Sequence, residues 1–123
     1  MIREDFDNFC GGLNNSENVV QWGNSSVWKI GGKIFAIHSI WGEGSHGKIS
    51  FKCHTHSFAI LTELPGIIPA PYLARAKWVQ LQEEDALYVD DIHDYIESAY
   101  FIIATKLTKK LQAQLGIRFP ENE

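Results

Sequence analysis

Six basic side chains and a tryptophan are the residues of this chain best suited to binding chemistry. They fall within residues 24–82, where six bases face only two acids, although the whole protein carries a net charge of −4. Cationic groups bind phosphates and an indole stacks on a nucleobase, so the combination favours contact with nucleic acid. The residues are Lys29, Lys33, Lys48, Lys52, Arg75, Lys77 and Trp78. We predict weak, salt-sensitive DNA binding through all of them except Lys33.

The position of Trp78 depends on the periodicity of an expected strand at residues 77–82. Val79 and Leu81 alternate with Trp78, which predicts that the valine and leucine enter the core and the indole lies on the opposite, polar face. Two interpretations stay open. Either the indole lies outward as a stacking surface, or the proline-rich segment 65–78 covers it and closes a satellite core.

Alternation in residues 48–53 bears on the basic patch itself. Lys48, Ser50 and Lys52 point to one face of the expected strand and the apolar residues between them to the other. We therefore expect one face of the sheet to be solvated, with Lys48 and Lys52 sharing it. The six bases form either one patch on this face or an ordinary solvated surface.

A second charged block follows, because residues 83–97 contain seven acids and no base. Asp90, Asp91 and Asp94 are candidates for contact with a protein partner. Asp90, Asp94 and Glu97 also fall close to one face of an expected helix, where carboxylates could hold a hard cation. The simpler interpretation is that acids at a helix N-terminus cap it or stabilise its dipole.

Cysteine and histidine occur together in Cys53-His54-Thr55-His56, and both types are good ligands for zinc or copper. No second cluster supplies further ligands, so we expect structural or capping roles and no metal or other cofactor. Cys10 and Cys53 are expected to remain free thiols.

No catalytic motif is recognisable, and we expect a binding protein rather than an enzyme. The GEGSHG sequence at residues 42–47 fits a hairpin turn and lacks the context of a phosphate-binding loop. The N-terminus does not resemble a signal peptide, and no apolar run approaches the roughly 20 residues that span a bilayer, so we expect a cytoplasmic protein. The length of 123 residues predicts one domain covering 1–123.

Hydrophobic spacing predicts an α+β fold in which an antiparallel sheet packs against N-terminal and C-terminal helices. A glycine pair, Gly31-Gly32, suits a tight hairpin turn. Thr55 or Ser57 is expected to cap the second helix. The expected helices are 2–13, about 55–64 and a continuous helix of five turns from Ile92 to Leu111, and the expected strands are 27–30, 33–41, 48–53 and 77–82.

The order of several short motifs resembles the MmcQ/YjbR family. They are Phe9-Cys10, Trp22-Gly23, the hairpin Lys29 to Ala36, Ile49 to Cys53, Pro65-Gly66-Ile67, Pro69-Ala70, Lys77-Trp78 and Ser98-Ala99-Tyr100. The resemblance implies a frataxin-like (CyaY-like) fold and DNA binding by analogy to a double-wing arrangement. The sequence departs from the family at Ala74-Arg75-Ala76-Lys77, which keeps positive charge but lacks the usual asparagine. A protein-interaction, small-ligand or metal-handling module without catalysis is the alternative function.

Overall fold

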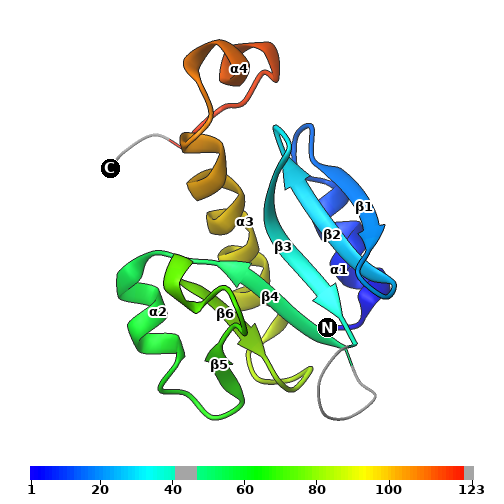
Figure 1. Cartoon of the computed structure of the whole chain (residues 1–123), viewed down its shortest axis with the longest axis vertical. Coiled ribbons are helices and arrows are strands. Elements are labelled where there is room, and N and C mark those ends of the chain that lie inside the picture. The colour runs from blue at the N-terminus through cyan, green and yellow to red at the C-terminus, as the bar shows by residue number, and fades with distance from the viewer. Residues whose placement is uncertain (41–46, 121–123) are drawn as a thin grey trace.

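The structure is a computed structural model that describes residues 1–40 and 47–120. Within these residues, six strands form one antiparallel sheet in the order β1-β2-β3-β4-β6-β5 (Figure 1). The strands are β1 (Glu17–Gln21), β2 (Ser25–Ile30), β3 (Lys33–Ser39), β4 (Lys48–Lys52), β5 (Ile67–Pro69) and β6 (Trp78–Leu81). The helices are α1 (Arg3–Gly11), α2 (Thr55–Leu61), the short 3₁₀ helix η1 (Ala74–Ala76), α3 (Val89–Thr105) and α4 (Lys109–Gln114).

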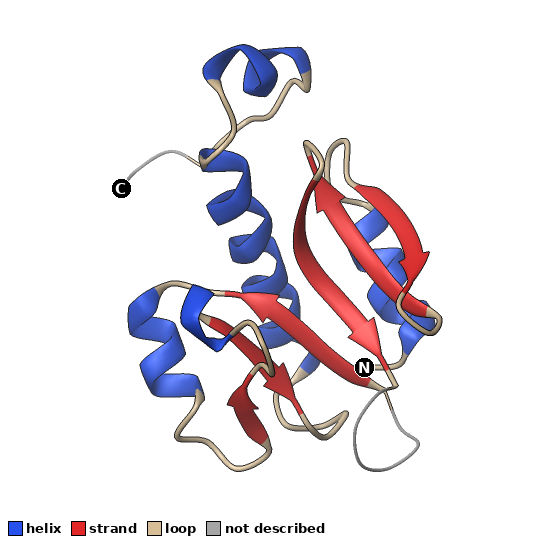
Figure 2. Cartoon of the chain, in the orientation of Figure 1, coloured by secondary structure: helices blue, strands red, loops and turns tan. Residues whose placement is uncertain are grey.

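Helices α1 and α3 cover one face of this sheet, which we call the inner face (Figures 1 and 2). The main core lies between them, and it includes Phe6 of α1, Phe35 and Phe51 of the central strands, and Ile92 and Ile96 of α3. Each of these five side chains is fully buried. The predicted α+β fold with N-terminal and C-terminal helices against an antiparallel sheet is confirmed.

The glycine pair between β2 and β3 forms the tight turn that the sequence predicts. Gly31 and Gly32 both have positive φ, 58° and 81°, which is strained for residues with a Cβ. A Cβ on Gly31 would lie 2.6 Å from a methyl group of Leu107. The turn therefore packs closely against the segment that joins α3 to α4.

The prediction of one continuous helix from Ile92 to Leu111 is wrong. Helix α3 ends at Thr105, and the hydroxyl of Thr108 accepts a hydrogen bond from the Leu111 amide at 3.1 Å, which starts α4. The spacing of apolar residues misses the break because Leu107 is still buried and Leu111 still packs on the core.

Gln112 of α4 stabilises this break. Its amide nitrogen donates to the carbonyl oxygens of Ala104, Thr105 and Leu107 at 3.0, 3.3 and 3.1 Å. These carbonyls belong to the last turn of α3 and the residues after it, where backbone acceptors lose their helical partners.

Other boundaries also differ from the predictions. Strands β1 and β5 were not expected: β1 is exposed along most of its length, and β5 has only three residues and ends in a proline. Helix α2 begins after His54, which makes no side-chain capping bond, so neither Thr55 nor Ser57 is the cap. Trp41 and the predicted turn up to His46 lie outside the described residues.

Replacing Gln112 should test its role at the helix junction. We expect Gln112→Ala to lower the free energy of unfolding by about 1–3 kcal/mol, because buried carbonyls lose their donor. Gln114→Ala is the matched control, since Gln114 is exposed on the same helix, and it should change stability by less than about 0.5 kcal/mol. Equal effects in chemical denaturation would contradict the assignment.

His38 is a buried polar residue on the inner face. It is 4% exposed, and its Nδ1 has no hydrogen-bond partner among the described residues. Burial lowers the pKa of His38 below its usual 6.5, and Arg3 and the N-terminal ammonium lower it further, while Asp7 and Glu84 oppose this.

This lowered pKa predicts a loss of stability in mild acid. As the pH falls below about 6.5, the unfolded chain takes up the His38 proton before the folded chain does, so folding free energy is lost. We expect His38→Gln to flatten the dependence of stability on pH below this value in denaturant titrations. His56→Gln, at an exposed position, should leave the dependence unchanged, and a wild-type dependence in His38→Gln would refute the explanation.

Candidate functional site

The face of the sheet opposite α1 and α3, here called the outer face, is partly covered rather than solvated. Val27, Ile37 and Trp78 lie on it and are 0%, 8% and 6% exposed. They form a second apolar cluster together with Ala70. The expectation of one wet face is therefore wrong, because the chain between β5 and β6 folds back over the strands.

This covering segment is the β5–β6 connector, residues 70–77. It is held to the start of β6 by backbone hydrogen bonds: the Ala70 amide donates to the Trp78 carbonyl at 3.0 Å, and the Trp78 amide donates to the Leu73 carbonyl at 3.2 Å. The connector lies in front of β4 and β6 in the view of Figure 1.

Trp78 thus closes a satellite core, the second of the two interpretations that the sequence left open. Strand parity is confirmed, because Val79 and Leu81 enter the main core while Trp78 takes the other face. The indole is buried beneath the connector and offers no exposed stacking surface.

The six bases divide into three groups. Lys48 shares the outer face with Lys52, as alternation predicts, but its side chain is only 2% exposed, so it does not belong to an exposed patch. Lys29 lies across from Glu17 of β1 on the neighbouring strand, and Lys33 is exposed at the start of β3. The remaining three, Lys52, Arg75 and Lys77, lie at or near the connector.

A third lysine that the sequence did not indicate, Lys106 at the C-terminal end of α3, lies close enough to act on the charge of Lys52. The pKa of Lys52 is lowered, first by its burial and then by the charges of Lys106 and Lys77, with Cys53 opposing. The Lys52 ammonium also donates to the carbonyl of Ala76. The Lys77 ammonium lies 5.1 Å from the ring centroid of Phe58, within range of a cation–π contact.

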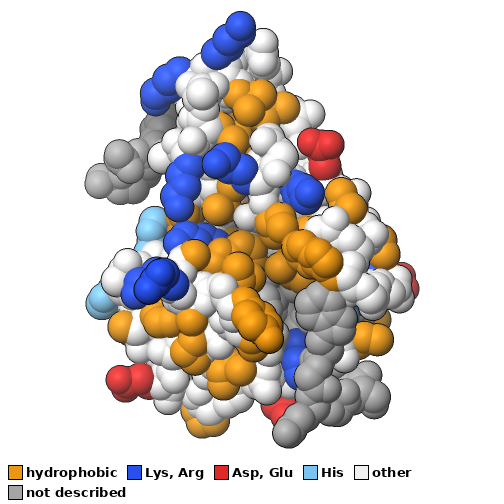
Figure 3. Space-filling view, in the orientation of Figure 1, with side chains coloured by type: hydrophobic (Ala, Val, Ile, Leu, Met, Phe, Trp, Pro, Cys, Tyr) orange, Lys and Arg blue, Asp and Glu red, His pale blue; other side chains and the backbone are white. Residues whose placement is uncertain are grey.

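We call Lys52, Arg75, Lys77 and Lys106 the cationic edge. These residues come from β4, η1 with the residue after it, and the end of α3, so only folding assembles them. Figure 3 shows Lys and Arg side chains gathered beside a hydrophobic area on this face, with acidic side chains near the margins. Lys106 was missed because it lies far along the chain and its position next to β4 depends on tertiary packing.

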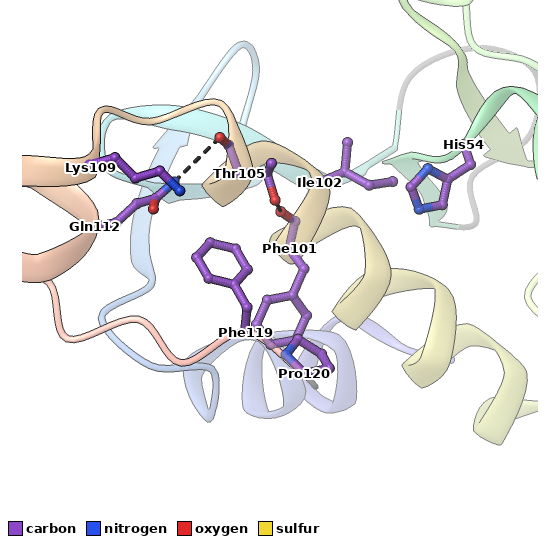
Figure 4. Close-up of a pocket in the computed structure, with 8 residues that line it drawn as sticks. All are labelled: His54, Phe101, Ile102, Thr105, Lys109, Gln112, Phe119 and Pro120. Atoms are coloured by element: carbon purple, nitrogen blue, oxygen red, sulfur yellow. Dashed lines mark hydrogen bonds between the residues drawn. The ribbon is translucent and has the colours of Figure 1, made fainter. Parts of the chain in front are cut away.

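Two hollows accompany this surface. One of about 390 Å³ lies between α3, α4 and the C-terminal segment, with His54 and Lys109 at its wall (Figure 4). The amide of Gln112 and the hydroxyl of Thr105 within it bind helix carbonyls, and the rings of Phe101 and Phe119 lie 5.8 Å apart. The second, of about 340 Å³, lies between the connector and strands β3, β4 and β6, and is called the outer-face pocket.

Asp90, Asp91 and Asp94 are exposed at the beginning of α3. The helix starts at Val89 after Tyr88, which makes no side-chain capping bond. Asp90 and Asp91 are therefore not caps but lie in the first turn, where their charges favour the helix dipole.

The thiol and the two histidines that follow β4 do not form a common site. Burial raises the pKa of Cys53 to about 11, and its thiol lies 3.4 Å from the Lys77 carbonyl oxygen, while His54 and His56 are exposed. Cys10 is buried and its pKa is raised by burial and by Asp7. Both cysteines are free.

In the described ranges, no three His, Cys, Asp or Glu side chains form a group suited to a metal ion.

Comparison with known proteins places this fold. The solved structures that resemble this chain include proteins from Deinococcus radiodurans and Pseudomonas syringae. The Deinococcus radiodurans protein DR2400, with a DUF419 domain, has a TM-score of 0.84 at 18% identity, over 95% of this chain and 89% of the other. A Pseudomonas syringae protein, structural-genomics target PsR293, has a TM-score of 0.70 at 20% identity, over 84% of this chain and 99% of the other. At these identities the likeness concerns the fold alone.

No curated protein matches the chain. In the part of the chain that the structure describes, no helix is both long and apolar enough to cross a membrane. The predicted likeness to frataxin stays a prediction.

The family model described as YjbR matches residues 12–102, most of the sequence, so this chain belongs to the YjbR family.

Proposed function

We propose that this protein is a non-enzymatic domain that binds DNA weakly through the cationic edge. The observation that carries the proposal is the gathering of Lys52, Lys77 and Lys106. The Lys52 ammonium donates to the carbonyl of Ala76, the residue before Lys77, and the pKa of Lys52 is lowered first by burial and then by the charges of Lys106 and Lys77. Holding like charges together raises the free energy of the folded protein, and an anionic ligand such as a phosphate backbone relieves this repulsion.

The composition of the edge favours phosphates over base edges. Arg75 is exposed on η1 and adds a planar guanidinium suited to bidentate phosphate contact. Trp78 and Lys48 are buried, and Lys29 lies on β2 across from Glu17, two strands away from β4. The proposed DNA site therefore narrows from the six predicted residues to Lys52, Arg75 and Lys77, with Lys106 added.

Weak binding follows from the small number of bases and the overall negative charge. With at most four phosphate contacts, the logarithm of affinity should fall with the logarithm of salt concentration with a slope of roughly −3 to −4. A cysteine nucleophile is disfavoured, because burial raises the pKa of both thiols and keeps them protonated and weakly nucleophilic at neutral pH.

Charge reversal tests the DNA proposal. Fluorescence anisotropy with labelled single- and double-stranded DNA at low salt should show saturable binding. We expect Lys77→Glu and Lys106→Glu each to weaken it and to reduce the salt slope by about 1. Lys33→Glu is the matched control, because it changes the charge equally at an exposed site outside the edge.

Two results would refute DNA binding through this edge. One is the absence of binding to either DNA at low salt. The other is an equal loss of affinity in Lys33→Glu and Lys77→Glu, which would mean that total charge rather than the edge decides affinity. Lys52→Glu combined with Lys77→Glu should reduce binding further than either single change.

A second candidate function is contact with a basic protein partner through Asp90, Asp91 and Asp94. It is favoured by the apolar side chains beside these acids: Tyr88 and Val89 are 84% and 49% exposed. A rim of acids around exposed apolar residues suits a protein interface better than a metal site.

Reversal of these acids tests the second candidate. We expect affinity capture with the wild-type protein to retain a basic partner that is lost when Asp90, Asp91 and Asp94 are changed to lysine. Changing Glu4, Glu17 and Glu63, which are exposed on or near other elements, should leave the capture unchanged. Retention of the same partner by both triple variants would exclude this surface.

A further inference from the structure

The outer-face pocket has the features of a small-ligand site. Ile37 of β3 and Leu73 of the β5–β6 connector are among its apolar walls, and Ser39, Ser50 and Gln80 supply polar groups. Its volume of about 340 Å³ lies in the lower part of the range for small-molecule sites. No charged side chain is among the described residues that line it, so its chemistry suits a neutral, largely apolar ligand.

A directed chain of hydrogen bonds ends in this pocket. The side-chain amide nitrogen of Gln82 donates to the amide oxygen of Gln80, and the Gln80 nitrogen donates to the hydroxyl oxygen of Ser50 at 3.3 Å. The Ser50 oxygen therefore acts as an acceptor within the chain, and its own proton remains to be donated. Among the described residues, no acceptor receives it, although Ser50 is only 5% exposed. A ligand acceptor would complete the chain.

Tyr72 supplies an aromatic surface at the rim. It is 104% exposed, so its ring packs on nothing in the described structure. Its φ of 67° is also uncommon for a residue with a side chain, and such backbone conformations cluster at ligand-binding positions. An exposed ring beside an apolar hollow is suited to stacking on a flat partner.

From these three features we propose that the outer-face pocket binds a neutral heteroaromatic ring that carries a carbonyl or ring-nitrogen acceptor, the chemistry of a nucleobase. Ser50 donates its hydroxyl proton to the acceptor, Ile37 and Leu73 contact the ring, and Tyr72 stacks against its exposed part. This site goes beyond the proposed DNA binding, because a free nucleoside would need no contact with the cationic edge.

Nucleoside titrations monitored by NMR test this site. Thymidine and guanosine, at concentrations up to the millimolar range, should produce saturable shifts in the side-chain amide of Gln80 and the backbone amides of Ser50 and Tyr72. We expect Ser50→Ala to weaken binding about fivefold to tenfold, and Tyr72→Ala to weaken it by a similar or larger factor. Ala70→Leu, which fills the pocket, should abolish it.

Two controls keep the result specific. Tyr88→Ala removes another highly exposed tyrosine, which lies outside this pocket, and should leave nucleoside affinity unchanged. Lys77→Glu should also leave it unchanged, so a failure of DNA binding and a failure of this site are distinguishable. The proposal is overturned if no nucleoside gives saturable shifts, or if the shifts persist in folded Ala70→Leu.

The source of the ring is decided by comparing thymidine with a thymidine oligonucleotide. If Ser50→Ala weakens both, the pocket also accepts an unpaired base from a strand. If it weakens only thymidine, the pocket serves free nucleosides or bases. Both results support the site, whereas unaltered binding of both probes in Ser50→Ala and Tyr72→Ala would refute it.

Discussion

The docking of the β5–β6 connector onto the outer face through Trp78 is the interaction on which both candidate sites depend. Two backbone hydrogen bonds tie the connector to Trp78. The indole packs in an apolar cluster with residues of both the connector and the sheet. Two residues of this segment, Tyr72 and Lys77, have positive φ, which costs free energy in residues with a Cβ. Burial of an indole, worth several kcal/mol in protein cores, is large enough to offset that cost.

The connector also separates the two candidate sites. At its C-terminal end, the carbonyl of Ala76 accepts a hydrogen bond from the Lys52 ammonium, and Lys77 adds a second positive charge. At its N-terminal end, Ala70 to Leu73 form one wall of the outer-face pocket. A single segment therefore fixes both a charged surface and a neutral cavity, and changes to Trp78 should not be interpreted as the loss of a ligand contact alone.

The sequence predicts the inner half of the molecule better than the outer half. Residues with a strict period, such as Phe51 between polar neighbours or Ile92 and Ile96 on α3, are placed correctly because one face of each element must be buried. Gly31-Gly32 is also predicted, because its turn chemistry is local. Strand β1 escapes prediction since its residues are exposed on both faces and show no periodicity.

The candidate site is only partly predictable for the same reason. Parity gave the correct face for Lys48, Lys52 and Trp78, but whether that face meets water depends on the path of the connector, which no local rule fixes. Lys106 joined the cationic edge through the packing of α3 on β4, and the hydrogen bonds of Gln112 that end the helix nearby arise from α4. Such non-local contacts leave no spacing in the sequence.

Charge segregation along α3 has a consequence for how the molecule approaches a polyanion. Exposed aspartates occupy the first turn and Lys106 follows the last, so opposite charges lie about 25 Å apart along a helix of 17 residues. A polyelectrolyte's field exerts a torque on such a separation, turning the lysine-bearing end forward and the carboxylates away before the surfaces touch. For the proposed binding to DNA, this orientation would make productive encounters more frequent at low ionic strength, where charges act over longer distances, although the net charge of the protein opposes approach.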